Sequence, residues 1–172
     1  MRTDMHVQQG RPEPGPEIWI RGPVALPEEP PPPSPSATTP RRFSWIGTHG
    51  GAGVSTLAAV YGGHDCGRAW PGPADPPSVL LVARTHAAGL AAALNALDVF
   101  RRGEAPHGLD LDAVVLVADA PGRLPRPLAE RVKMIESVID VYRVPWVPAW
   151  RLGHLSGQPP RETEALARLT GR

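Results

Sequence analysis

The distribution of proline restricts where this chain can form a packed domain. Eleven of its 23 prolines lie in the first 40 residues, including the run from Pro30 to Pro33. Proline removes a backbone donor and fixes φ, so neither a helix nor a sheet continues through a segment of that proline density. We therefore expect residues 1–40 to be a disordered tail and residues 41–172 to form one domain of ordinary size.

One apolar segment interrupts the tail, Glu17-Ile18-Trp19-Ile20-Arg21-Gly22-Pro23. A tryptophan between two isoleucines is unusual in a linker, and such a segment is able to dock on a partner or on the chain's own domain. A chance apolar interruption explains the same residues equally well. Residues 17–23 are therefore a candidate docking segment, and both interpretations stay open.

The composition excludes several classes of protein. The single cysteine, Cys66, cannot form a disulfide framework and suits a reducing cytoplasm. No stretch of about 18 apolar residues is present, so we expect no membrane-spanning helix. The 18 basic and 17 acidic residues give a net charge of +1, which provides no strong signal for nucleic-acid binding. A cytoplasmic protein is the expectation that fits these observations.

After the tail, apolar runs alternate with segments of helical spacing. Short apolar runs predict strands at residues 43–47, 78–83, 113–118 and 141–144. Helical spacing predicts helices at 55–61, 87–100 and 162–169, and the best amphipathic series runs from Leu128 to Tyr142. This alternation predicts an α/β fold with a small, mostly parallel sheet flanked by helices.

The segments that follow the predicted strands define a candidate site. In parallel sheets, ligands bind beyond the carboxyl ends of the strands. Four segments would share that edge, namely 47–55, 84–89, 119–126 and 145–151. They also hold most of the unusual residues of the chain, so we expect the functional site there.

The first of these segments has the order of a phosphate-binding loop: a strand, a glycine-rich turn and then a helix. In such loops, inward-facing backbone N–H groups and the positive end of the helix bind the anion. The standard pattern has a lysine directly after the last glycine, and this chain has Val54 there. Ser55 lies where a hydroxyl would meet Mg²⁺. The candidate phosphate-binding residues are Gly50, Gly51, Ala52, Gly53, Val54, Ser55 and Thr56.

These residues resemble the loop of the ParA/MinD family of SIMIBI-class P-loop ATPases, which reads Lys-Gly-Gly-x-Gly-Lys-Thr-Thr. On that pattern His49 replaces the signature lysine, Val54 replaces the phosphate lysine, and Ser55-Thr56 supply the two hydroxyls. Loops of the type Gly-Gly-x-Gly-Ala-Ser-Thr-Leu-Ala, in the TadZ/CpaE and septum-site-determining branches, also lack the phosphate lysine. The resemblance implies a truncated P-loop NTPase-like domain with ATP or ADP and Mg²⁺ as its ligands.

The resemblance places Asp119 in one of two ways. In the first, residues 114–119 are a Walker B strand whose acid holds Mg²⁺ through water. In the second, which we prefer, residues 79–97 are a later family strand and helix, and Asp119 lies on the base side or is structural. Val144-Pro145 then resembles the turn that flanks adenine. The switch region and Walker B strand would be deleted, because residues 62–77 are too few for both.

Loss of the lysine affects hydrolysis more than binding. Phosphoryl transfer depends on positioning and charge neutralisation, and one such charged contact contributes several kcal/mol, so efficient turnover is not expected. The backbone N–H groups and the helix dipole remain. His49, Arg84 and Arg123 lie on the predicted edge and are candidate substitutes for the missing charge, although an exposed arginine is more often only solvated.

A metal site of another kind is not expected. His64-x-Cys66, taken with His49 and His86, has no ligand spacing of the zinc type. Cys66 has no base beside it in the sequence, so an idle thiol is a better interpretation than a nucleophile.

The resemblance implies an accessory pseudo-ATPase that senses nucleotide or binds a partner protein. The settings it implies are cellular positioning, plasmid or conjugative-element maintenance and secretion-system assembly. Two alternatives remain open. The protein is a slow ATP hydrolase in which an arginine replaces the lysine, or it is a protein-interaction module that binds no nucleotide.

Overall fold

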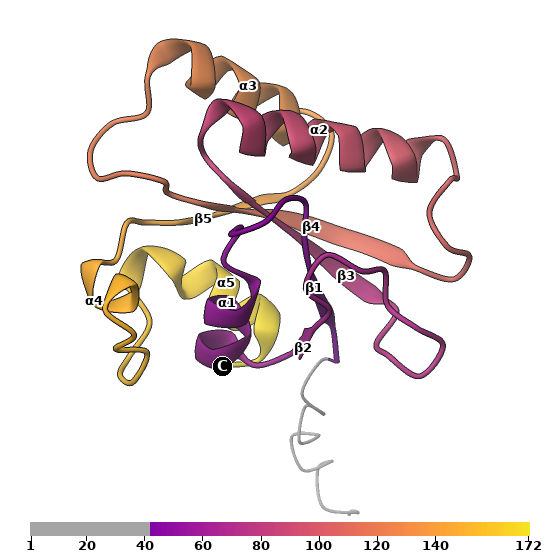
Figure 1. Ribbon diagram of the computed structural model, residues 1–172, viewed down its shortest axis with the longest axis horizontal. Coiled ribbons are helices and arrows are strands. Elements are labelled where there is room, and N and C mark those ends of the chain that lie inside the picture. Colours follow the sequence, from indigo (N-terminus) through magenta and orange to yellow (C-terminus); the bar gives the residue numbers. More distant parts are fainter. Residues whose placement is uncertain (1–41) are drawn as a thin grey trace, which may run out of the picture. The chain divides into compact units, whose positions relative to one another are not determined.

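Five parallel strands form the centre of the fold in the computed structural model (Figure 1). Their order across the sheet is β2-β1-β3-β4-β5. The strands are β1 (Ser44–Gly47), β2 (His64–Asp65), β3 (Ser78–Arg84), β4 (Asp110–Val117) and β5 (Val141–Val144). The predicted α/β fold is confirmed, and every pairing in the sheet is parallel.

The structure describes residues 42–172, which belong to one compact unit. The predicted tail at residues 1–40 and the candidate docking segment at residues 17–23 lie outside the described residues. Of the helices in residues 42–172, none has the length and apolar character needed to cross a membrane.

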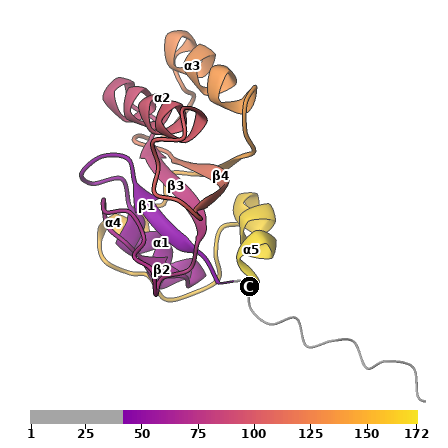
Figure 2. The same ribbon diagram turned by 90° about the vertical axis from the view of Figure 1, so that its right-hand side faces the viewer.

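Helices cover both faces of the sheet (Figures 1 and 2). Buried residues of α1 (Val54–Tyr61) and α5 (Glu164–Thr170) pack in one apolar cluster, and those of α2 (Ala87–Arg101) and α3 (Arg126–Glu136) pack in another. Successive residues of β3 alternate between the two clusters. Because both faces are covered, the central strands are continuous apolar runs, as their sequences predicted.

The strand register brings four chain segments to the carboxyl edge of the sheet. Gly47 is level with Val82, and Val117 is level with both Arg84 and Val144. Backbone hydrogen bonds from the residues that follow β1, β3 and β4 continue the ladder past the strand ends. The predicted edge is therefore formed, with its segments side by side.

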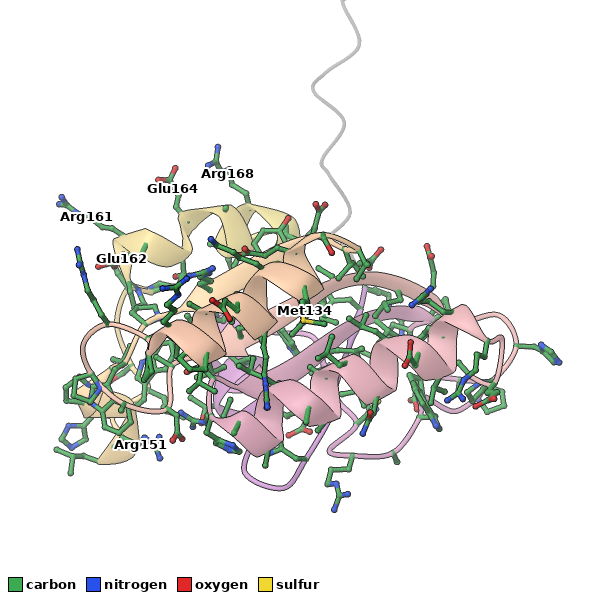
Figure 3. All side chains as sticks on the ribbon, turned by 90° about the horizontal axis from the view of Figure 1, so that it is seen from above. Met134, Arg151, Arg161, Glu162, Glu164 and Arg168 are labelled. Carbon is green, nitrogen blue, oxygen red and sulfur yellow. The ribbon has the colours of Figure 1, made fainter. Side chains whose placement is uncertain are left out.

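The prediction that the amphipathic series from Leu128 to Tyr142 forms one helix was wrong. Helix α3 ends at Glu136, and a turn leads into β5. Ile139 packs from that turn on the same apolar cluster as α3, which is why the spacing continued. Tyr142 belongs to β5 and packs on the opposite face of the sheet. Helix α3 also leaves Met134 exposed (Figure 3).

Two short elements were not predicted. Strand β2 lies inside the segment 62–77, for which the sequence predicted no strand. Helix α4 (Pro148–Arg151) has proline in its first turn, where the missing N–H costs nothing. A 3₁₀ turn, η1 (Arg161–Thr163), precedes α5.

Candidate functional site

The glycine loop connects β1 to α1 and is held open by two left-handed residues. Gly51 has φ of 74° and Gly53 has φ of 107°, values that residues with a side chain adopt only with strain. Residues 49–56, together with Gly67, Arg68 and Arg84, line a concave surface of about 400 Å³. We call this surface the cradle. It contains every residue that the sequence predicted to bind phosphate.

Val54, at the lysine position, packs in the hydrophobic core and is only 7% exposed. Its Cγ2 atom would lie 3.0 Å from a Cβ atom added to Gly47, so β1 and α1 meet closely here. Ser55, the next residue, is exposed at the surface of the cradle. The first turn of α1 thus presents a hydroxyl to the cradle and an apolar side chain to the core.

Arg84, the last residue of β3, extends its side chain to the glycine loop. Its Nε atom donates to the carbonyl of Gly51 at 3.2 Å, and its Nη1 atom donates to the carbonyl of Ala118 at 3.0 Å. Its Nη2 atom lies 3.6 Å from where a Cβ atom on Gly53 would be. The guanidinium therefore lies between the loop and the end of β4, and part of it lines the cradle.

Within residues 42–172, the hydrogen bonds of the Arg84 guanidinium go to two backbone carbonyls. Burial lowers the pKa of this guanidinium, the nearby positive charge of Arg151 lowers it further, and Asp119 opposes both. None of the carboxylates in residues 42–172 forms an ion pair with Arg84. Arg84 and Arg151 thus place two positive charges at this part of the edge, with the Asp119 carboxylate as the nearby negative charge.

His49 fixes the loop against β3 and takes up both ring nitrogens in doing so. Nε2 accepts a hydrogen bond from the backbone N–H of Arg84 at 3.0 Å, and Nδ1 lies 2.8 Å from the carbonyl of Gly50. Both ring nitrogens of His49 are thus engaged by the loop and by β3. Arg68 and Arg84 bring guanidinium groups to the cradle.

Gly89, in the first turn of α2, leaves room for the contact between His49 and the backbone of Arg84. The sequence did not predict this role. A Cβ atom on Gly89 would lie 2.3 Å from the carbonyl oxygen of Arg84 and 2.9 Å from Nε2 of His49. Its N–H donates to Nδ1 of His86, the residue before the helix, at 2.9 Å. The sequence feature that could have indicated this role is a glycine within a predicted helix, because glycine destabilises a helix and is found there when close packing requires it.

Asp119, Arg123 and Pro145 lie together in a second cavity, of about 590 Å³, at the carboxyl ends of β4 and β5 beside α3. The backbone N–H of Asp119 donates to the hydroxyl of Thr85 at 3.1 Å. None of these three residues lines the cradle, so the structure separates them from residues 50–56.

A small cavity of about 40 Å³ lies between the other two. It shares Gly53, Thr56 and Arg84 with the cradle, and it shares Pro145 with the larger cavity. The order along the edge is therefore cradle, Arg84 and then the Asp119 cavity.

Arg151 is a further cation at this edge that was not predicted. Its guanidinium carbon lies 4.4 Å from the centre of the Trp146 ring, a cation–π distance. It also lines the small cavity with Arg84, and Figure 3 shows its side chain at the end of α4. The sequence feature that could have indicated the contact between Arg151 and Trp146 is their short spacing after β5.

Residues 43–168 match a protein family with the description "Family of unknown function (DUF6668)". No curated protein and no solved structure matches the chain. The matched residues include all five strands and every residue of the cradle.

Proposed function

The chain belongs to the DUF6668 family, a family of unknown function, and we propose that its domain is a pseudo-ATPase module that binds the phosphate groups of a nucleotide without efficient hydrolysis. The resemblance of the loop to ParA/MinD proteins supports an accessory role in which a partner protein reads the bound state. Cellular positioning, plasmid or conjugative-element maintenance and secretion-system assembly are the settings that this resemblance implies.

The position of Arg84 carries the proposal. The loop lacks its lysine, and the neighbouring strand brings a guanidinium to the same cradle, with hydrogen bonds to Gly51 and Ala118. Exposed loop glycines, the positive end of α1 and a cation that forms no ion pair within residues 42–172 together form a suitable environment for phosphate oxygens. These hydrogen bonds distinguish Arg84 from a surface arginine that contacts only solvent.

Phosphate fits the cradle better than Mg²⁺ does. Proteins bind Mg²⁺ next to nucleotides with one or two carboxylates in addition to phosphate oxygens and water. Of the described residues that line the cradle, none is a carboxylate, and Ser55 and Thr56 offer hydroxyls alone. Asp119 lines the other cavity. This arrangement supports phosphate binding that needs no Mg²⁺. It gives less support to the alternative that the protein is a slow ATP hydrolase.

The Asp119 cavity supports the second placement of this residue, on the base side of the site. Its volume of about 590 Å³ is in the range of small-molecule sites, which is about 300–1,000 Å³. Strand β3 lies between β1 and β4, so Asp119 is two strands away from the glycine loop. The segment 62–77 contains only the two-residue β2, which agrees with a deleted switch region and Walker B strand.

Thermal unfolding of the full chain tests this proposal. We expect ATP, ADP and inorganic triphosphate to stabilise the protein, by about 2.7 kcal/mol at 100 times the dissociation constant, with equal effect in Mg²⁺ and in EDTA. Adenosine, which has no phosphate, is the matched control, at constant ionic strength. ATP and ADP should stabilise more than triphosphate if the base occupies the Asp119 cavity.

Two outcomes would contradict the proposal. If none of the phosphate compounds stabilises the protein at millimolar concentration, the interaction-module alternative is favoured. If ATP binds only with Mg²⁺ and phosphate is released over many turnovers, the protein is a slow hydrolase. A phosphate-release assay on the same samples separates the second outcome from simple binding.

A further inference from the structure

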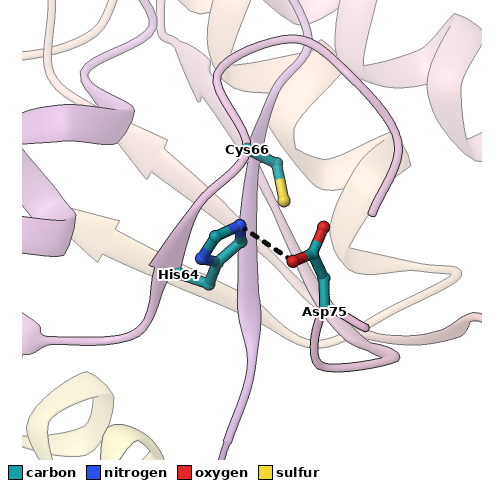
Figure 4. Close-up of side chains that lie close together, drawn as sticks. All are labelled: His64, Cys66 and Asp75. Carbon is teal, nitrogen blue, oxygen red and sulfur yellow. Dashed lines mark ion pairs between the residues drawn. The ribbon is translucent and has the colours of Figure 1, made fainter. Parts of the chain in front are cut away.

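Three side chains able to bind a metal converge beside β1, and none of them is a residue that lines the cradle (Figure 4). They are His64 in β2, Cys66 directly after it, and Asp75 from the connection to β3. One ligand atom of each lies within 4.8 Å of those of the other two, and Nε2 of His64 lies 3.2 Å from Oδ1 of Asp75. Spacing in the sequence concealed this group, because Asp75 is nine residues beyond Cys66.

Backbone hydrogen bonds hold the residues that carry these ligands. The N–H of His64 donates to the carbonyl of Phe43 at 2.9 Å, and the N–H of Cys66 donates to the carbonyl of Trp45 at 3.1 Å. Around Asp75, its own N–H donates to the carbonyl of Gly72, and the N–H of Gly72 donates to Oδ2 of Asp75 at 2.8 Å. A ligand to this site would therefore order little additional chain.

The Cys66 thiol lies within 4.8 Å of ligand atoms of His64 and Asp75, and the Asp65 carboxylate also acts on it. Burial raises the pKa of the thiol, a hydrogen bond with Ser44 lowers it, and the carboxylates of Asp75 and Asp65 raise it further. A raised thiol pKa makes Cys66 a poor free nucleophile. A divalent cation reverses this effect, since it replaces the thiol proton and offsets the two carboxylates.

The donor set and its dimensions indicate the class of metal. One imidazole nitrogen, one thiolate and one carboxylate suit a borderline-soft cation, and zinc is the common one. Bonds of about 2.0–2.3 Å in a tetrahedron place ligand atoms roughly 3.3–3.8 Å apart. The His64–Asp75 separation is 3.2 Å, and all three ligand atoms lie within 4.8 Å of one another, so the cluster is close to these dimensions.

We propose that His64, Cys66 and Asp75 bind one Zn²⁺ ion, with water at the fourth position. The His64 side chain is 48% exposed, which gives the ion and its water access to solvent. An ion pair between His64 and Asp75 alone is the competing explanation. Such a half-exposed pair contributes little to stability and does not involve the cysteine.

Zinc at this position would brace the turn that borders the cradle. Gly67, next to Cys66, accepts a hydrogen bond from the N–H of Gly47 at 2.7 Å. Arg68, the following residue, lines the cradle. The metal site itself does not depend on the proposed phosphate site, and each is tested separately.

Cobalt substitution tests the site, because Cys66 is the only cysteine in the chain. The reduced, metal-free full chain is titrated with Co²⁺ and then with Zn²⁺ against a chromophoric chelator. We expect one metal per chain, a thiolate-to-cobalt charge-transfer band, and displacement of Co²⁺ by Zn²⁺. Cys66→Ser should abolish the band.

Matched variants identify the other ligands. Asp75→Asn keeps an oxygen that accepts from Gly72 but removes the charge, and we expect it to weaken Zn²⁺ binding at least about 10–100-fold, as we also expect for His64→Asn. His107→Asn, at an exposed histidine outside the cluster, should bind as the wild type does. Circular dichroism checks that each variant folds. Absence of the band in the wild type, or unchanged affinity in Cys66→Ser, Asp75→Asn or His64→Asn, would overturn the proposal.

Discussion

Val54 occupies the position at which the resembling loops carry a lysine, and Arg84 brings a cation to the same cradle from the neighbouring strand. The valine is buried against β1, whereas the arginine contacts the loop through two carbonyls. At the scale of single residues, apolar packing and positive charge are thus supplied from two elements. A lysine in the loop would supply both from one position.

Gly89 permits this arrangement, and Gly89→Ala tests it. The added methyl group would meet the carbonyl oxygen of Arg84, which is backbone and moves only with β3. We expect a loss of up to about 2 kcal/mol in the free energy of unfolding, since a clash that costs about 1–3 kcal/mol is offset by a helix-propensity gain of about 1 kcal/mol. Urea unfolding measures the change.

Ala91→Gly, at an exposed position of the same helix, measures the propensity difference by itself and is the control for Gly89→Ala. We expect it to cost about 1 kcal/mol. If Gly89→Ala instead stabilises the protein by a similar amount, the close approach of α2 to Arg84 and His49 is absent in solution.

Sequence reasoning at this scale found Arg84 but not its contacts. A basic residue at the end of a predicted strand was enough to place it on the functional edge. The hydrogen bonds of His49 and the close approach of Gly89 depend on how α2 packs against the loop, which no local pattern contains. Asp75 joins His64 for a similar reason, since the connection that carries it returns to β2.

At the scale of elements, the continuous apolar strands were predictable, while short or interrupted elements were not. Strands β3 and β4 are buried on both faces, and their composition alone identified them. Strand β2 has two residues and no periodic signal. The end of α3 was missed because the turn after it packs Ile139 on the same cluster as the helix.

Val54, in the first turn of α1, is the position at which the loop can be given back its lysine. Val54→Lys places a side chain with a flexible stem at a residue that lines the cradle as well as the core. We expect lower stability without ligand, because a buried methyl pair is lost, and at least about tenfold tighter triphosphate binding from the added charge. Calorimetric titration measures the binding.

Val54→Met is the control for Val54→Lys, because it has a similar unbranched stem without the charge. Its stability should fall less, and its affinity for triphosphate should equal that of the wild type. Equal affinities in the Lys and Met variants would indicate that the loop does not hold phosphate where the lysine of a P-loop reaches it.

At the scale of the whole folded unit, one edge of the sheet collects the candidate chemistry. Three cavities lie along it, and Arg84 separates the cradle from the cavity of Asp119 and Pro145. The topology explains why sequence reasoning located the edge, since parallel strands end on the same side. It also explains why Asp119 and Ser55 are apart, since β3 lies between their strands.

In the proposed function, Arg84 replaces the missing lysine in binding phosphate. Its most direct test is calorimetric titration of inorganic triphosphate, in EDTA, into the wild type, Arg84→Gln and Arg126→Gln. Arg126 is an exposed arginine paired with Glu130 on α3, at 3.1 Å, and is the matched control.

We expect Arg84→Gln to weaken triphosphate binding by about 10–100-fold, the effect of a charged hydrogen-bonded contact of roughly 1.5–3 kcal/mol, and Arg126→Gln to leave it unchanged. Equal affinity in the wild type and Arg84→Gln, or equal loss in both variants, would contradict this role of Arg84.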